Sequence, residues 1–324
     1  MLKEDVKRKW LHSIIVLIVT GGLLVYLAMT TDYMAFWDAI RASRTGLFLL
    51  TALIFSGLTW LTDAMGVHYQ LGRLDNGLKF TTVFRAKGAS YLLNILNYNI
   101  ALLGMAYYFK EKGNSSFSEN LGGFALITLI DLALLALIGL IGMFVRPDVV
   151  NGRFVPFVWI GLAIGAAGPV VLKFISSRGR LLPGWVGRLL GHDLLTAFRT
   201  VKPGDLLVLM GLRAILVFEY IVMQAIFLFS FGFHVPFGYL VLVEPLLTLV
   251  GVIPISFSGI GTVQVVMRHV FPQYAPHGIT AVAAVDAYST ASILGILLIR
   301  VLIGLLNLSF LNRMRTAVDQ GLET

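Results

Sequence analysis

The sequence lacks cysteine and has little charge. None of its 324 residues is Cys, and Asp, Glu, Lys and Arg together make up only 13% of the chain. Without cysteine the chain can form no disulfide, no thiolate metal site and no thiol nucleophile. Soluble proteins carry about 25% charged residues, whereas this chain is 57% hydrophobic with a mean hydropathy of +0.85. These values predict an all-α polytopic membrane protein.

Motifs for catalysis and for cofactors are also missing from the sequence. No Walker A motif occurs, so we expect no nucleotide hydrolysis by this chain. The six histidines form neither an HExxH motif nor a cluster with carboxylates, so we expect no metal and no cofactor. Ser256 and Ser258 lack a nearby histidine base, and the Gly-Ile-Gly-Thr run from Gly259 is not a nucleophile elbow. No catalytic residue is therefore predicted.

What the sequence does contain is a series of apolar segments. Eight of them follow one another along the chain: 11–29, 46–61, 80–109, 121–145, 154–174, 206–233, 236–271 and 279–310. None of the connecting stretches is long and polar enough for a soluble domain. We therefore predict a single integral membrane domain over residues 1–324.

The basic residues predict how these segments cross the membrane. If every segment crossed once from a cytoplasmic N-terminus, the loop 173–203, with six Lys and Arg, would lie outside, against the positive-inside rule. If 80–109 and 236–271 instead enter and return on one side, the cytoplasmic segments become the most basic ones. The Lys and Arg counts are then 4, 4, 2 and 6 for the N-terminus and the loops 63–87, 110–120 and 173–203, against 2 and 2 for the outside loops 30–46 and 146–153.

This bias predicts six full spans plus two re-entrant helical hairpins, with both termini cytoplasmic, in the inner membrane of the cell. The net charge of +8 is then attributed to loops facing anionic lipid rather than to nucleic-acid binding. The order span, span, hairpin, span occurs twice, and the second copy starts from the opposite side. We therefore predict an inverted repeat with halves 1–145 and 154–310. Transporters with such repeats bind substrate near the membrane midplane.

The segment 236–271 is interrupted in its middle. Pro254 removes a backbone donor there. It is followed by Ser256, Ser258, Gly259 and Gly261. At membrane depth, unwound backbone survives only when it is buried in protein or lines a wet cavity. A helix that restarts at Thr262 would present free N–H groups and a positive dipole, which suit a phosphate or carboxylate. The alternative interpretation is a kinked spanning helix with a packing defect.

Polar groups near this break and within 80–109 form a candidate head-group site. Three Asn side chains in one apolar segment are costly unless they find partners. Arg268 lies about two turns beyond Gly261, and a guanidinium binds a phosphate by two parallel hydrogen bonds. The predicted substrate-binding residues are Asn94, Asn97, Asn99, Ser256, Ser258, Gly259, Gly261, Gln264 and Arg268.

Ionisable residues within the apolar segments are the second group of candidates. They are Asp131, Arg213, Glu219, Glu244, Arg268, Asp286 and Arg300. The three acids Asp131, Glu244 and Asp286 could neutralise the three arginines, in which case the pairs only hold helices together. Asp131 and Glu244 are alternatively candidates for ion or proton coupling.

Two stretches carry a resemblance to a known family. One is Ile253–Gln264, with the sequence IPISFSGIGTVQ, and the other is Arg85–Asn99, with the sequence RAKGASYLLNILNYN. They resemble the transmembrane, flippase-like region of the lysylphosphatidylglycerol synthase family. That family commonly has a Gly-Gly-x-Gly-like turn followed by Glu, whereas this chain has Ser-Gly-Ile-Gly from Ser258 and then Gln264. The soluble aminoacyl-transferring domain is absent, so we expect no lysine transfer.

The resemblance implies a lipid flippase or translocase that acts on an amphiphilic lipid. The implied lipid classes are anionic phospholipids, glycolipids and isoprenoid or hopanoid lipids. Two alternatives stay open: a non-catalytic membrane subunit of an envelope-lipid biosynthesis pathway, and a membrane-embedded transferase that uses a lipid-linked substrate. The expected partners are membrane lipids and envelope-lipid biosynthesis proteins, and no nucleic acid.

Overall fold

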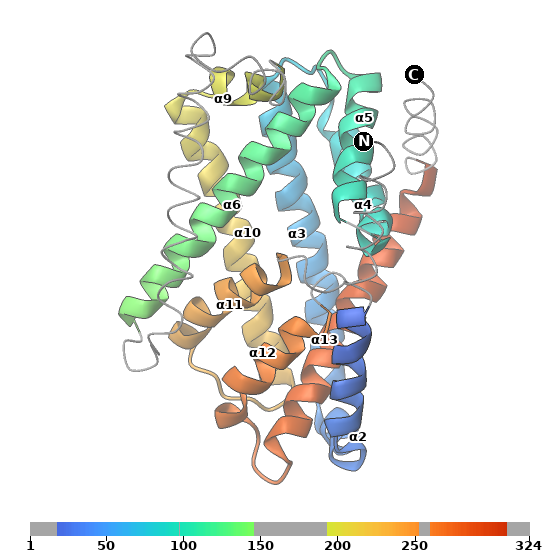
Figure 1. Cartoon of the computed structure of the whole chain (residues 1–324), viewed down its shortest axis with the longest axis vertical. Helices are drawn as coiled ribbons and strands as arrows, with labels where there is room; N and C mark the ends of the chain where they lie inside the picture. The colour runs from blue at the N-terminus through green and yellow to red at the C-terminus, as the bar shows by residue number, and fades with distance from the viewer. Residues whose placement is uncertain (1–17, 97, 146–192, 253–259, 310–324) are drawn as a thin grey trace.

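The secondary structure of the described residues is entirely helical. The structure is a computed structural model and describes residues 18–96, 98–145, 193–252 and 260–309. Within these ranges every regular element is a helix, which confirms the predicted all-helical class. Figure 1 shows long helices running along the molecule, with shorter helices packed beside them in its upper and lower halves.

Four of the described helices are long and apolar enough to cross a membrane. They are α3 (Thr45–Arg73), α6 (Phe117–Val145), α10 (Pro203–Ser230) and α13 (Ala281–Leu306). Each contains 26 to 29 residues and is therefore about 40 Å long, which exceeds the hydrocarbon thickness of about 30 Å. These helices confirm a multi-pass membrane protein. The predicted span 154–174 lies outside the described residues.

The N-terminal part of the described chain is bent. The helix Ile18–Thr30 and α2 (Tyr33–Ala42) meet at 86°, and together they count as a fifth span only if the bent pair is one span. The prediction of a loop over 30–45 is wrong, because α2 occupies most of it. Asp32 caps α2 by accepting hydrogen bonds from the backbone N–H groups of Met34 and Ala35.

The helix α3 is about three turns longer than predicted. The apolar segment was expected to end at Leu61, and a loop was expected to follow as far as Lys87. The helix instead continues through the polar sequence to Arg73, because its polar side chains are buried against other helices rather than exposed to solvent. The connection to the next helix is only the short turn 74–79, in which Asp75 and Gly77 have positive φ.

Two pairs of short helices complete the bundle. The helices α4 (Phe80–Leu96) and α5 (Tyr98–Lys112) lie side by side in the upper half of Figure 1, as expected for the hairpin 80–109. The helices α11 (Phe237–Val252) and α12 (Thr262–Val270) lie in the lower half, and the break between them falls mostly outside the described residues. The helix restart predicted at Thr262 is confirmed. Re-entry from one side, and the inverted repeat, remain predictions.

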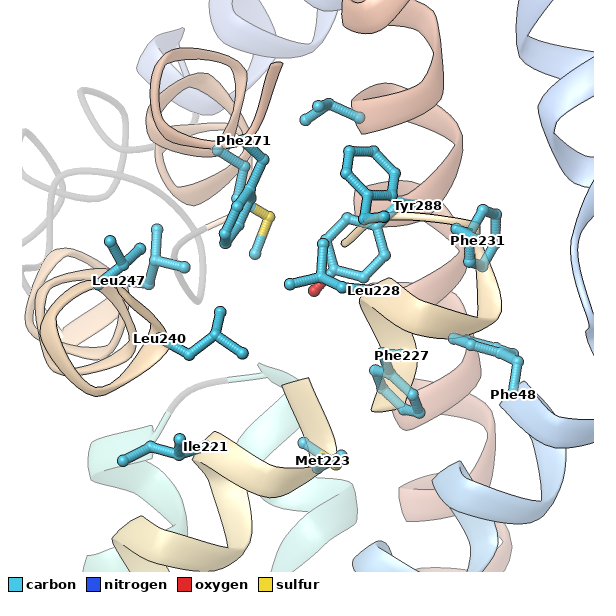
Figure 2. Packing of buried hydrophobic residues seen from close by; sticks show 14 of the residues in the cluster. Phe48, Ile221, Met223, Phe227, Leu228, Phe231, Leu240, Leu247, Phe271 and Tyr288 are labelled. Atoms are coloured by element: carbon cyan, nitrogen blue, oxygen red, sulfur yellow. The ribbon is translucent and has the colours of Figure 1, made fainter. Parts of the chain in front are cut away.

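Aromatic side chains fill the centre of the lower half. Figure 2 shows Tyr288 of α13, Phe271 after α12 and Phe227 of α10 converging on one cluster. Phe48 of α3 joins it, with its ring centroid 4.5 Å from that of Phe227. This cluster fixes the α11–α12 pair against three of the membrane-length helices.

Contacts between helix ends show which loops lie at the same end of the molecule. Arg73 at the end of α3 forms an ion pair with Asp205 at the start of α10, at 3.3 Å. The start of α6 packs so closely on η3 (Asp193–Leu195) that the Leu194 carbonyl occupies the space of a Cβ at Gly122. At the opposite end, the Arg44 N–H donates to the Ser230 carbonyl at 2.8 Å.

The described basic residues gather at the first of these two ends. They are Arg73, Lys79, Lys110, Lys112, Arg199 and Lys202, whereas the opposite end carries Arg41 and Arg44. The loop 110–120 and the described part of 173–203 thus lie at one end, as the predicted topology requires. The positive-inside rule predicts that this basic end faces the cytoplasm.

Single-cysteine labelling tests this topology in a chain that has no cysteine of its own. We expect Lys112→Cys and Lys202→Cys, both at exposed positions, to react with a membrane-impermeant maleimide only after spheroplasts are permeabilised. We expect His277→Cys, exposed at the other end, to react in intact spheroplasts. Labelling of positions 112 and 202 from opposite sides would contradict the arrangement.

Candidate functional site

A network of four charged side chains lies inside the helix bundle. The Arg213 guanidinium of α10 donates two hydrogen bonds to the Asp131 carboxylate of α6, at 2.6 and 2.7 Å. Its third nitrogen donates to Asp63 of α3 at 2.6 Å. The Lys87 ammonium of α4 lies 2.7 Å from the other oxygen of Asp63. One connected ion network therefore joins α3, α4, α6 and α10.

The network is balanced in charge and largely withdrawn from solvent. Two carboxylates face two cations, and the side chains of Arg213 and Lys87 are each only 8% exposed. Gly66 of α3 lies beside Arg213, and a Cβ there would be 3.6 Å from it, so the helix surface is flat where the guanidinium passes. Buried charges of this kind require mutual pairing and saturated hydrogen bonds.

A second buried ion pair joins α12 to α13 and to the N-terminal bend. The Arg268 guanidinium donates two hydrogen bonds to Asp286, at 2.6 and 2.7 Å. It also donates to the Thr30 hydroxyl at 2.6 Å and to the Thr31 hydroxyl at 3.1 Å. The sequence-based pairing of intramembrane acids with arginines is thus found for Asp131 and for Asp286. The pairing expected for Arg300 is not found among the described residues.

The residues at the start of α12 form a helix cap. Gly261 has a φ of 89°, which favours glycine, and its N–H donates to the Gln264 Oε1 at 3.2 Å. Leu23 of the N-terminal helix packs where a Cβ would stand, at 2.8 Å, so a larger residue at position 261 would clash. One oxygen of Gln264 therefore closes the helix terminus, leaving its amide nitrogen for other partners.

The other predicted head-group residues are only partly located. Ser256, Ser258, Gly259 and Asn97 lie outside the described residues, as does the side chain of Asn99. Asn94 lies on α4, and its Oδ1 is buried without a hydrogen-bond partner in the described structure. The structure thus groups Gly261, Gln264 and Arg268 on α12 and leaves Asn94 on a different helix pair.

Glu244 of α11 is in a different situation from the paired acids. Its Oε2 is buried and has no hydrogen-bond partner in the described structure. Tyr288 of α13 is the described titratable group that interacts with it electrostatically. In Figure 2 the Tyr288 hydroxyl points from α13 toward the side of the cluster formed by α10 and α11. A buried carboxyl oxygen without a hydrogen-bond partner is costly, which distinguishes Glu244 from the paired acids.

Sequence analysis missed two members of the ion network, Asp63 and Lys87. Both were assigned to the region after the second span, because that span was expected to end at Leu61. A signal was nevertheless present in the spacing of small and polar residues. They recur three or four positions apart, as one helix face requires: Ser56, Thr59, Asp63, Gly66 and Gln70.

A groove opens between α3, α10 and the start of α4, near the basic end of the molecule. Its volume is about 690 Å³. Its lining residues are Leu61, Met65, His68, Tyr69, Gly72, Arg73, Phe80, Val208 and Leu212. The walls are mostly apolar, while Arg73 adds a charge beside Tyr69 and Asp205. Such a groove can hold hydrocarbon chains with a polar group at one end.

The sequence of this chain also matches a known protein family. The sequence matches the family described as Lysylphosphatidylglycerol synthase TM region over residues 13–304, which is most of the chain. No curated protein matches the sequence. Among the described residues, no group of three or more His, Asp or Glu is placed to hold a metal ion.

Removal of one cation from the network tests its contribution to stability. We expect Arg213→Ala to lower the free energy of unfolding by about 3–5 kcal/mol, because it leaves two buried carboxylates facing one ammonium. The melting temperature of the purified protein in detergent measures this loss. Arg41→Ala is the control, because its ion pair with Asp38 at 3.9 Å is exposed and contributes little. Equal melting temperatures for the two variants would rule out a stabilising role of the network.

Proposed function

The chain belongs to the lysylphosphatidylglycerol synthase TM region family, and from this premise we propose that it moves an amphiphilic membrane lipid between leaflets. The candidate lipids are anionic phospholipids, glycolipids and isoprenoid or hopanoid lipids. Transport takes place in the inner membrane, and both termini are cytoplasmic. The lipid head group passes through the protein while the acyl chains stay in the bilayer.

The observation that supports this proposal most is the charged interior beside two pairs of short helices. A head group crossing hydrocarbon alone would lose its hydration, which is costly for a charged or polar group. Polar side chains inside a helix bundle lower that cost. Transporters place their substrate sites at interrupted helices for the same reason, since unwound backbone offers free polar groups there.

The head-group site in this proposal lies at the break and at the α4–α5 turn. Its residues are Asn94, Asn97, Asn99, Ser256, Ser258, Gly259, Gly261, Gln264 and Arg268. Arg268 contacts a head-group phosphate by sharing its guanidinium between the phosphate and Asp286, which holds it in place. The apolar groove at the basic end receives the acyl chains of lipid from the cytoplasmic leaflet.

Transport is passive or ion-coupled, because the sequence has no nucleotide-binding motif. Of the two acids considered for a proton step, Asp131 already accepts two hydrogen bonds from Arg213. The buried Oε2 of Glu244 has no such partner among the described residues. Glu244 is therefore the better candidate to gain and lose a proton during transport.

Leaflet exchange in proteoliposomes tests the proposed function and the role of Arg268. We expect the wild type to make head-group-labelled lipid in the inner leaflet accessible to dithionite faster than protein-free vesicles do, and Arg268→Ala to lose this exchange. The double variant Arg268→Asp, Asp286→Arg keeps opposite charges at the pair but removes the cation from position 268.

The double variant separates two roles of Arg268. Exchange that stays lost in it supports phosphate binding by Arg268, whereas restored exchange means that the pair only holds α12 on α13. Absence of exchange by the wild type for every phospholipid and polyprenyl lipid would overturn the flippase proposal. A membrane subunit or a lipid-linked transferase would then be the better interpretation.

A second substitution tests the proton step at Glu244. We expect Glu244→Gln to keep the wild-type melting temperature, because the amide has the volume of the neutral acid, and to make exchange insensitive to an imposed pH difference. Glu219→Gln is the matched control, since Glu219 is also within a membrane-length helix but accepts a hydrogen bond from Thr62 at 2.7 Å. A wild-type response to the pH difference in Glu244→Gln would remove Glu244 from this role.

A further inference from the structure

Arg300 differs from the other described cations inside the bundle. Lys87, Arg213 and Arg268 each meet a carboxylate at 2.6 or 2.7 Å. Arg300 on α13 forms no ion pair with any described residue, and its guanidinium instead lies over the Tyr91 ring, with Cζ 5.4 Å from the ring centroid. An arginine at this depth without a counter-ion is costly and is a functional candidate for that reason.

The packing of α13 on α4 directs Arg300 toward the interior. Gly304, one turn after Arg300 on the same face of the helix, packs so closely on Leu92 of α4 that no Cβ fits there. Asp286, the acid on the same helix, lies fourteen residues earlier and is therefore about 21 Å away along the axis. It cannot neutralise Arg300, and it is already bound to Arg268.

Two tyrosines lie within electrostatic range of both Arg300 and the ion network. Tyr91 lies one turn after Lys87 on α4, and Tyr220 lies on α10. The charges of Arg300 and of Asp63 both act on these two side chains, which places the tyrosines within range of each. Neither hydroxyl makes a hydrogen bond to a described residue.

A further unsatisfied donor lies on the same helix face as Tyr220. Gln224 follows it by one turn on α10, is only 6% exposed, and its Nε2 is buried without a hydrogen-bond partner in the described structure. The nearby carboxylate of Asp63 is already held by Lys87 and Arg213. Arg300 and the two phenols thus lie near one another, and the Gln224 amide lies one turn beyond Tyr220. Among the described residues, no acceptor satisfies these donors.

We propose that Arg300, Tyr91, Tyr220 and Gln224 form a binding site for the phosphate of an anionic membrane lipid. A phosphate diester carries one negative charge and several acceptor oxygens, so it neutralises the guanidinium and accepts from the neutral donors. Arg300, Tyr220 and Gln224 lie within membrane-length helices, which favours a lipid phosphate over the free ion. The proposal deepens the proposed function, because it gives the head group a site apart from the break.

Binding in detergent tests the site without requiring transport. The probes are phosphatidylglycerol and phosphatidylcholine with six-carbon chains, and inorganic phosphate, titrated into purified full-length protein and followed by thermophoresis. We expect Arg300→Gln to weaken phosphatidylglycerol binding at least tenfold, and Tyr220→Phe to weaken it several-fold. Arg44→Gln is the matched control, because Arg44 also lies over a ring, that of Phe229 at 4.7 Å, but at an exposed position.

The outcomes separate this site from the transport proposal. Equal phosphatidylglycerol affinity in Arg300→Gln and Arg44→Gln overturns the site, as does wild-type affinity for phosphatidylcholine equal to that for phosphatidylglycerol. Inorganic phosphate binding as tightly as the lipid would replace the lipid with the free ion and overturn the assignment. If Arg300→Gln does not fold, the phosphatidylglycerol affinities of Arg300→Lys and Tyr220→Phe are compared with that of Arg44→Gln instead. Arg300-dependent binding without leaflet exchange would support the site and contradict the transport proposal alone.

Discussion

The Arg213 guanidinium is the point on which the arrangement of the upper half depends. In lipid, apolar helices gain little from meeting one another, because hydrocarbon already surrounds them. Directional polar bonds therefore decide which helices pair and at which height. Arg213 binds carboxylates from α3 and α6 at once, and Lys87 extends the network to α4. The short α4–α5 pair is thereby fixed to three longer helices.

The two arms of the broken segment are held in different ways. The α12 arm is capped by Gln264 and tied to α13 and to the N-terminal bend through Arg268. The α11 arm contains Pro245 and Glu244, whose Oε2 has no hydrogen-bond partner among the described residues. Proline removes one helical hydrogen bond and weakens the turn around it. Motion between the two arms is therefore expected to occur in α11, with α12 as the fixed reference.

The sequence predicts the helical class, the family and the restart of α12, because these depend on composition and on local signals such as Gly261. It predicts the partners of Arg213 and Arg268 in part, since opposite charges in lipid must meet. It does not predict Asp63 or Lys87. The apolar run ends at Leu61, which predicts a helix end there, whereas burial by neighbouring helices lets α3 continue to Arg73. Local hydropathy cannot report that burial.

The long separation between the charged partners has a consequence for biogenesis. Asp131 precedes Arg213 by 82 residues, and Thr31 precedes its acceptor Asp286 by 255 residues. When α6 leaves the ribosome, its acid has no arginine to meet, and an Asp at the centre of a membrane helix costs about 3 kcal/mol. The Asp131 carboxylate therefore has to wait for Arg213 until α10 has been synthesised. The polar contacts between the helices are thus completed late, because Asp286 of α13 is synthesised after every other residue of these pairs.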